Sequence, residues 1–192
     1  PVLKILNKNN YNIGVVVSGA HLSDVHNKTI KNIQNDNLEI VDMVDSLLST
    51  DRPVQRSKGV GLLIQGISQT VEKYNPDMLI VVGDREESIA TSIVGNYMNK
   101  LVLHIGGGDP VYGNADDPIR FAVSKLSHVH FCTSKDYAEN LIKVGEEKFR
   151  VFNVGNPSYS NIDNTPRISF TTLKYSLKLD SKRYLVFIYH PL

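Results

Sequence analysis

The stretch Met78-Leu-Ile-Val-Val82, with the Gly83-Asp-Arg-Glu-Glu87 that follows it, indicates the fold more clearly than any other part of the chain. A run of five apolar residues without alternating polar positions is typical of a parallel strand that is covered on both faces. The charged residues after it would form a loop at the carboxyl end of that strand. Ligands of open parallel sheets bind at this edge. The segment therefore predicts an inner strand followed directly by candidate site residues, Asp84 and Arg85.

Similar short apolar runs recur along the chain and alternate with longer amphipathic stretches. We expect strands at residues 13–17, 78–82, 101–105, 129–133, 150–154 and 184–189. Between them, apolar residues recur at helical spacing in three stripes: Val60, Ile64, Ile67 and Val71; Ile89, Ile93 and Tyr97; and Ile119, Val123 and Leu126. We interpret these stripes as the core-facing sides of helices. The alternation predicts an α/β protein with a Rossmann-like, doubly wound parallel sheet.

Residues that are typical of helix starts and helix ends occur where the predicted alternation of strands and helices requires them. Asp117 before Pro118 is typical of an N-cap followed by proline in the first turn, and Ser134 stands before another helical stretch. Gly145 follows that stretch and suits the left-handed residue that ends a helix. The opening residues 1–6 resemble the middle of a helix.

The chain is expected to contain one domain and the beginning of another. Residues 1–155 would form the Rossmann-like domain. Residues 156–183 begin with a stretch rich in proline, serine and asparagine and are interpreted as a linker region, while 184–192 would open a second domain. Because the sequence opens in a helical pattern and closes in a strand pattern, we expect it to be a fragment at both ends.

The composition excludes several classes of protein. The 192 residues include 21 Lys and Arg against 20 Asp and Glu, so the chain lacks the basic excess of a nucleic-acid binder. No apolar run approaches the length of about 18 residues needed to span a bilayer, and no signal peptide is visible. The one cysteine, Cys132, lies in an apolar stretch and is expected to be a reduced, buried thiol. These features favour a cytoplasmic protein without a membrane or nucleic-acid partner and without a metal cluster.

Polar clusters follow four of the expected strands, and the carboxyl ends of parallel strands meet at one edge. The candidate site residues are His21, Asp84, Arg85, His104, Gly107, Gly108, Asp109, Asp116, Asp117, Arg120 and His190. Arginines and helix N-termini bind anions, and crowded carboxylates exchange protons near neutral pH. The set favours a phosphate-bearing substrate and proton transfer at carbon. Neither a Walker loop nor a G-x-G-x-x-G fingerprint is present.

Each cluster also has a purely structural interpretation. Asp84 is placed to cap the helix that starts near Glu86, and His104 could be a satisfied core histidine. The glycines at 106–108 would serve a tight turn with positive φ, and Asp116 with Arg120 would form a helix-surface ion pair. A functional site is favoured because all of these residues converge on one edge of one predicted sheet.

These loops resemble those of the hydrolysing UDP-N-acetylglucosamine 2-epimerases of sialic-acid and related nonulosonate biosynthesis. The Gly-Asp-Arg and Asp-x-x-Ile-Arg strings are similar to the hydrolysing branch in particular. The matching strings occur in family order along nearly the whole chain: Ser18-Gly-Ala-His-Leu-Ser23, Gly83-Asp-Arg-Glu-Glu87, His104-Ile-Gly-Gly-Gly-Asp109, Asp116-Asp-Pro-Ile-Arg120, Ser124-Lys-Leu-Ser-His128, Gly155-Asn-Pro-Ser-Tyr159 and His190-Pro191.

The resemblance implies the N-terminal half of a two-domain fold of the glycosyltransferase GT-B type, with the sugar nucleotide held between two Rossmann-like domains. The implied reaction eliminates UDP from UDP-N-acetylglucosamine through a 1,2-unsaturated glycal and adds water, which gives free N-acetylmannosamine and UDP. No redox cofactor is implied, and the expected partners are a UDP-sugar and further copies of the chain in a dimer or tetramer.

The resemblance also implies roles for the candidate residues. Those implied to surround the sugar and its leaving group are Asp84, His104, Asp116, Arg120 and, from the start of the second domain, His190. The substrate-binding set is His21, Arg85, Gly107, Gly108 and Asp117. A base removes the proton at C2 while cationic groups stabilise the departing diphosphate.

The chain departs from the family pattern in three places. Where the family usually has Glu or His, this chain has Gly106, and Asp109 is the residue that we expect to substitute in part for the missing carboxylate. The family's first strand, which is central in its sheet, is absent, so inner strand edges would be left unpaired. Most of the second domain is absent as well, and these 192 residues alone are expected to show little or no turnover.

Three other functions stay open on the sequence alone. Relatives with similar loops act on UDP-linked diacetamido-trideoxy hexoses, and nothing in these motifs reads the substituents at C4 and C6. A non-hydrolysing epimerase is the second alternative. The third, which Gly106 allows, is an inactive protein that only binds a sugar nucleotide.

Overall fold

The computed structural model describes the chain except for residues 49–51, 114, 160–161, 163–164, 181–182 and 190–192. Two compact units are present, Pro1–Pro157 and Ser158–Leu192. All of the strands that the structure describes belong to the first unit, and α8 (Phe170–Ser176) belongs to the second. Candidate residue His190 lies outside the described residues.

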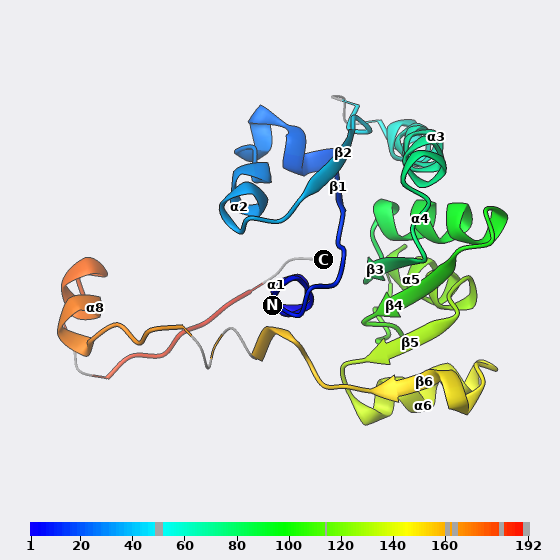
Figure 1. Cartoon of the computed structure of the whole chain (residues 1–192). Coiled ribbons are helices and arrows are strands. Elements are labelled where there is room, and N and C mark those ends of the chain that lie inside the picture. Colours follow the sequence, from blue (N-terminus) through cyan, green and yellow to red (C-terminus); the bar gives the residue numbers. More distant parts are fainter. Residues whose placement is uncertain (49–51, 114, 160–161, 163–164, 181–182, 190–192) are drawn as a thin grey trace. The chain divides into compact units, whose positions relative to one another are not determined.

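The first unit alternates strands with helices, as Figure 1 shows. In chain order it contains α1 (Val2–Lys8), β1 (Val15–Ser18), the 3-10 turns η1 (Gly19–Leu22) and η2 (Asp24–His26), α2 (Ile30–Asn35), β2 (Ile40–Val44), α3 (Val54–Tyr74), β3 (Met78–Val82), α4 (Glu86–Tyr97), β4 (Leu101–Ile105), α5 (Asp116–Lys125), β5 (Val129–Cys132), α6 (Lys135–Lys143), the 3-10 turn η3 (Lys148–Arg150) and β6 (Val151–Asn153).

Every strand pairing in the described chain is parallel, which confirms the predicted α/β class. Strands β3, β4, β5 and β6 form one sheet in that order, and β1 pairs with β2 in a second sheet. Strands β3 and β4 have the predicted bounds and pair in register, with Val81 opposite His104. Within the described residues, β1, β2, β3 and β6 each have one edge without a neighbouring strand.

One observed strand was not predicted, and one predicted strand is not formed. Strand β2 was not predicted because Asp42 interrupts its apolar run. In the structure, the Thr70 hydroxyl donates a hydrogen bond of 2.5 Å to the Asp42 carboxylate. Residues 184–189 were expected to be a strand and are not, since nothing in the described chain pairs with them. Their side chains are exposed, Leu185 to 99%. An apolar run becomes a strand only where a neighbour takes up its backbone hydrogen bonds.

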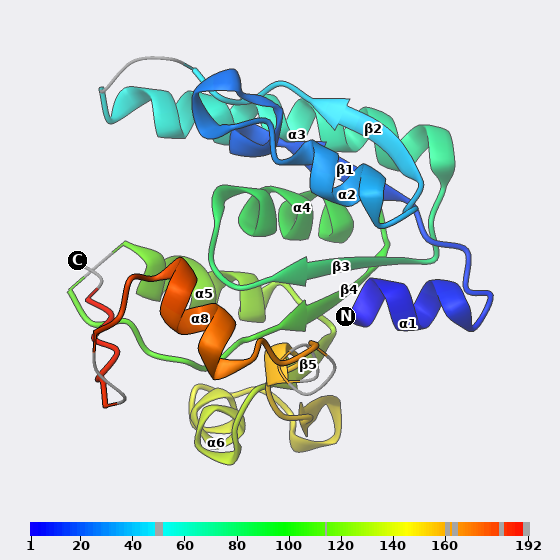
Figure 2. The same cartoon turned by 90° about the vertical axis from the view of Figure 1, so that its left-hand side faces the viewer.

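The helices pack on the sheets through two adjoining layers of aliphatic side chains. Figure 2 shows α4 between α3 and β3. Leu63, Ile67 and Val71 of α3 meet Ala90 and Val94 of α4 in one buried cluster, which confirms the core stripe of α3. The α4 stripe is rotated from its predicted position, so that Tyr97 at its end is 87% exposed and not in the core. A second buried cluster joins Val81, Val102 and Val123.

Helix α6 is bounded as the sequence predicts. The Ser134 hydroxyl accepts a hydrogen bond from the Tyr137 backbone N–H at 3.2 Å, and Gly145 has a left-handed φ of +94°. Under this helix lies Cys132, which is fully buried, and burial raises the pKa of its thiol to about 11. The thiol is therefore protonated at neutral pH, and the expected buried thiol is confirmed.

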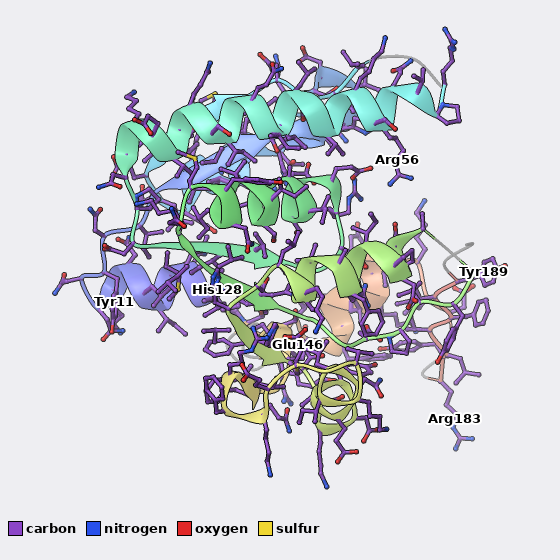
Figure 3. All side chains as sticks on the ribbon, turned by 90° about the vertical axis from the view of Figure 1, so that its right-hand side faces the viewer. Tyr11, Arg56, His128, Glu146, Arg183 and Tyr189 are labelled. Carbon is purple, nitrogen blue, oxygen red and sulfur yellow. The ribbon has the colours of Figure 1, made fainter. Side chains whose placement is uncertain are left out.

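A buried carboxylate ties the last strands to α5. Glu146, labelled in Figure 3, is fully buried and lies 2.5 Å from Arg150, 2.7 Å from Lys125 and 3.2 Å from His130. No hydrogen bond is formed to either Glu146 oxygen, and the contacts of Arg150 and Lys125 with this carboxylate are ion pairs. Burial lowers the pKa of His130, so its ring is a neutral neighbour of Glu146 at pH 7. Arg150 also donates to the Ser127 carbonyl at 2.8 Å. One carboxylate thus joins the ends of α5 and α6 to β5 and β6.

Replacement of Glu146 is expected to destabilise the protein strongly. In the Glu146→Gln variant, Arg150 would lose its buried counter-charge at 2.5 Å and keep only the exposed Glu147 carboxylate at 3.5 Å. Removal of one partner of a buried pair costs about 3–5 kcal/mol. Urea unfolding monitored by circular dichroism measures this change. The matched control is Glu147→Gln, because the side chain of Glu147 is 67% exposed, and exposed substitutions change stability by about 0.5 kcal/mol or less. Equal stability of the two variants would contradict the assignment.

Candidate functional site

The guanidinium of Arg120 joins two carboxylates at the carboxyl end of the larger sheet. Its Nη2 contacts Asp84, which follows β3, and its Nη1 lies 3.1 Å from a carboxylate oxygen of Asp109, which follows β4. Nη1 also donates to the Asp109 carbonyl at 2.5 Å. The side chains of Arg120 and Asp84 are only 12% and 14% exposed, whereas that of Asp109 is 40% exposed. The structure therefore brings together three of the residues selected from the sequence.

The start of α5 places Arg120 in this position. Helix α5 begins at Asp116, one residue earlier than its predicted cap, so Asp117 lies in the first turn and is not the N-cap. Its carboxylate accepts a hydrogen bond from the Val111 N–H at 2.7 Å. Asp117 therefore shapes the loop between Asp109 and α5 instead of capping the helix.

The structural alternative for Asp84, a helix cap, is not what the structure shows. Arg85 is the N-cap residue of α4 and makes no side-chain capping bond. The first turn of α4 is held instead by Ser88, whose hydroxyl donates to the Val82 carbonyl at 2.7 Å. The Asp84 carboxylate is left to pair with Arg120.

His104 lies beneath the site and is fully buried. Its Nε2 is 2.9 Å from the Gly83 carbonyl, which can only accept, so Nε2 carries the proton. Its Nδ1 then accepts from the Ser124 hydroxyl at 3.0 Å. Burial, which is the largest cause, lowers the pKa of His104 to about 4. Through these two hydrogen bonds the neutral histidine links the loop after β3 to α5. Its complete burial and its two hydrogen bonds favour the structural interpretation, in which His104 is a satisfied core histidine.

The glycines after β4 are required by the close packing around them. Gly106 and Gly108 have φ values of +85° and +83°, as the tight-turn interpretation expects. A Cβ on Gly107 would lie 2.7 Å from the Ser124 hydroxyl, and the carbonyl oxygen of Tyr137 occupies the place of a Cβ on Gly108. Only at Gly106 is there room, since the nearest atom to a Cβ there is 3.9 Å away.

The other candidate residues lie apart from this triad. His21 forms a hydrogen bond of 2.7 Å with Thr29, and the Arg85 side chain is 71% exposed. Asp116 is close enough to Arg56 to contribute to the raised pKa of that guanidinium, although the hydrogen bond from Arg56 to Glu86 contributes most. Arg56, labelled in Figure 3, lies 2.6 Å from Glu86.

A cavity of about 450 Å³ lies where the loops after β1 and β2 meet the starts of α3 and α4. Loops that follow strands of both sheets line this cavity, so the carboxyl ends of the strands in the two sheets lie on the same side of the first unit. Asp84, Asp109 and Arg120 are not among its lining residues. The residues that line the cavity include Gly19, Leu47, Pro53, Arg56, Arg85 and Glu86.

Two residues next to the site were not among the predicted site residues. Ser124 stands in one of the matching strings and follows Arg120 by one helical turn, which was the available signal. Arg56 gave no signal, since its partner Glu86 is distant in the sequence.

Within the described part of the chain, no group of three or more His, Cys, Asp or Glu side chains is arranged to hold a metal ion. Over the same residues, every helix is too short or too polar to cross a membrane.

The fold and the site geometry define a Rossmann-like α/β domain with a cluster of one guanidinium and two carboxylates at the carboxyl edge of its parallel strands. The sequence model of the UDP-N-acetylglucosamine 2-epimerase family matches residues 4–192, and the chain belongs to that family. This finding confirms the resemblance that the loop motifs indicated.

Individual relatives support the same assignment. The chain is 34% identical to the hydrolysing GDP/UDP-N,N'-diacetylbacillosamine 2-epimerase of Campylobacter jejuni, over 98% of this chain and 49% of that protein. It is 31% identical to the hydrolysing UDP-N,N'-diacetylbacillosamine 2-epimerase of Legionella pneumophila, over 99% of this chain and 51% of that protein. The chain therefore spans about half the length of these curated relatives.

The fold itself is similar to that of solved epimerases. The structure of UDP-N-acetylglucosamine 2-epimerase from Neisseria meningitidis, bound to UDP-N-acetylglucosamine, superimposes with a TM-score of 0.68 at 20% identity. The match covers 92% of this chain and 48% of that chain. At this identity the likeness shows the fold alone, which is the GT-B-like fold of these epimerases.

The buried neutral state of His104 is expected to make stability depend on pH. Between about pH 6.5 and pH 4 the unfolded chain binds a proton on this histidine and the folded chain does not, so stability falls as the pH falls through this range. From pH 7.5 to pH 5.0 the lowered pKa of His104 corresponds to a loss of about 2 kcal/mol.

Urea unfolding at the two pH values measures this loss, and the His104→Gln variant should lose about 2 kcal/mol less than the wild type between them. The matched control is His26→Gln, because His26 is exposed and should leave the pH dependence unchanged. An identical pH dependence in His104→Gln and the wild type would contradict the assignment.

Proposed function

We propose that this chain carries the catalytic loops of a hydrolysing 2-epimerase that acts on a nucleotide-linked 2-acetamido sugar. The observation that supports this most directly is the triad of Asp84, Arg120 and Asp109 at the carboxyl edge of the sheet. A carboxylate can remove a proton from carbon, and a guanidinium beside it can stabilise the charge of a departing diphosphate. Because the chain spans about half the length of its relatives, the complete activity is proposed for the protein in its natural full length.

In the proposed reaction, a carboxylate removes the proton at C2 of the sugar. The electron pair of the C2–H bond forms the C1=C2 double bond, and the bond from C1 to the nucleotide oxygen breaks. Water then adds its oxygen at C1, and a proton returns to C2 from the opposite face. We assign the role of base to Asp109, because its side chain is 40% exposed and can be reached by a substrate, whereas that of Asp84 is only 14% exposed.

Of the two UDP-sugars that the sequence left open, the comparisons favour UDP-N,N'-diacetylbacillosamine. The two relatives described above, at 34% and 31% identity, are hydrolysing diacetylbacillosamine 2-epimerases, and each match covers nearly the whole chain. UDP-N-acetylglucosamine remains the second candidate substrate, because the matching family model is named for that sugar nucleotide.

Proton NMR in deuterated water tests the proposal on the protein in its natural full length. UDP-N,N'-diacetylbacillosamine, its GDP counterpart and UDP-N-acetylglucosamine are supplied separately. We expect free nucleoside diphosphate and a free 2-epimerised sugar with deuterium at C2. A product that keeps its nucleotide would indicate a non-hydrolysing epimerase, and binding without turnover would indicate an inactive homologue.

Loss of the Asp109 carboxylate is expected to lower kcat by a factor of about 10²–10⁴ in Asp109→Asn, because an amide cannot accept the C2 proton. Steady-state kinetics on the turned-over substrate measures this effect. The matched control is Asp136→Asn, because Asp136 is an exposed carboxylate at the start of α6. A near-normal rate in Asp109→Asn would refute the role of Asp109.

A further inference from the structure

A buried hydrogen-bonded pair, His104 of β4 and Ser124 of α5, lies beneath the ion pair of Asp84 and Arg120. His104 is 0% exposed and Ser124 1% exposed. The Ser124 hydroxyl has one hydrogen and two acceptors within reach, the His104 Nδ1 at 3.0 Å and the Arg120 carbonyl at 3.1 Å. Because Nε2 carries the ring's proton toward the Gly83 carbonyl, Nδ1 is left as an acceptor, and the hydroxyl donates to it.

The peptide group between Gly83 and Asp84 is held by hydrogen bonds and not by packing. Gly83 has a left-handed φ of +68°. Apart from its chain neighbours, no atom of the described chain lies within 4 Å of the place of a Cβ on Gly83. Its N–H donates to the Ile105 carbonyl at 2.9 Å, and its carbonyl accepts from His104 at 2.9 Å. The bond from His104 therefore fixes the peptide plane from which the backbone of Asp84 continues.

Two links thus join the loop after β3 to α5. The first is the ion pair between Asp84 and Arg120. The second is the neutral bridge from Gly83, the residue before Asp84, through His104 to Ser124, one helical turn after Arg120. Two contacts one turn apart oppose rotation of the loop relative to the helix, which a single ion pair would allow.

The same pair supports the loop that carries Asp109. A Cβ on Gly107 would lie 2.7 Å from the Ser124 hydroxyl and 2.9 Å from Nδ1 of His104, so the backbone of this loop packs directly on their hydrogen bond. In a close-packed interior, a change in the orientation of either side chain is transmitted to such a neighbour. The loops of both carboxylates and the helix of Arg120 therefore meet at one buried hydrogen bond.

We propose that Ser124 is a positioning residue for the reaction, which acts through His104 to keep the Asp84 carboxylate paired with Arg120. This inference rests on the proposed function, because it concerns the guanidinium that would stabilise the departing diphosphate. Ser124 is buried and does not touch the reacting atoms. Its effect is transmitted through two hydrogen bonds, one to His104 and one from His104 to Gly83.

The test compares Ser124→Ala with the wild type in the protein at its natural full length. Without the hydroxyl, Nδ1 of His104 loses its donor, and the ring is free to turn away from the Gly83 carbonyl. Loss of this buried hydrogen bond should lower kcat about tenfold. KM should stay within about twofold, because Arg120 acts mainly on the charge that develops as the bond to the nucleotide breaks.

The matched control is Ser127→Ala. Ser127 is 3% exposed, and its hydroxyl donates to the Val123 carbonyl at 2.7 Å, so this variant loses a buried hydroxyl that is not bonded to His104. Urea unfolding checks that both variants are folded under the assay conditions. If the wild type turns over and Ser124→Ala matches Ser127→Ala in kcat and KM, the positioning role is overturned.

A second measurement follows the Gly83 peptide and does not need turnover. Glycine labelled with ¹³C at its carbonyl and aspartate labelled with ¹⁵N together give correlated NMR signals only from Gly–Asp peptides. These 192 residues contain two such peptides, Gly83–Asp84 and Gly108–Asp109. The Gly83 signal is identified by its absence in Asp84→Asn. Because the shift of a carbonyl depends on the hydrogen bond that it accepts, this signal should move in Ser124→Ala and stay in place in Ser127→Ala.

The two measurements separate the inference from the proposed function. A Gly83 carbonyl signal that is unchanged in Ser124→Ala would overturn the link from Ser124 through His104. Absence of turnover in the wild type, together with a signal that moves only in Ser124→Ala, would sink only the proposed function.

Discussion

The guanidinium of Arg120 lies between the carboxylates of Asp84 and Asp109, and the two loops that carry them depend on it for their mutual position. Two carboxylates at neighbouring strand ends repel each other, and a planar cation with several donors can satisfy both at once. Arg120 reaches them because α5 starts beyond the loop after β4 and crosses the edge of the sheet. The charges that the proposed chemistry needs are thereby also the charges that hold the loops together.

Neutral groups below the triad support it. His104 donates to the carbonyl of Gly83, the residue before Asp84, and accepts from Ser124, one turn after Arg120. A charged group at this place would carry a large cost of burial, and the lowered pKa of His104 shows which state the protein selects. The protein places another buried charge at Glu146, where two cations, Lys125 and Arg150, pair with one carboxylate. In both places the buried charges are paired.

Much of the fold could be predicted because local pattern and tertiary structure agree. Strands β3 and β4 were predicted to the residue, since a continuous apolar run has few other uses in a parallel sheet. Where the pattern was broken or had no neighbour, prediction failed. Strand β2 was not predicted because Asp42 breaks its apolar run, and the Thr70 hydroxyl that satisfies this carboxylate comes from a residue 28 positions further along the chain. Residues 184–189 form no strand because no described strand pairs with them, and pairing is not a local property. The choice of Asp117 as a cap was wrong by two residues, since the N-cap is Ala115, and an error of one or two residues is the usual uncertainty of a helix start.

The sequence by itself determined the α/β class, the family motifs and the placing of Asp84, Asp109 and Arg120 at one edge, because strand direction and residue order are enough to put loop ends together. Only the tertiary structure decided what each side chain does there. It assigned Arg120 to two carboxylates and His104 to a buried bridge between Gly83 and Ser124. These pairings join elements far apart along the chain, and the distance between two side chains across a fold is set by packing that no local pattern encodes.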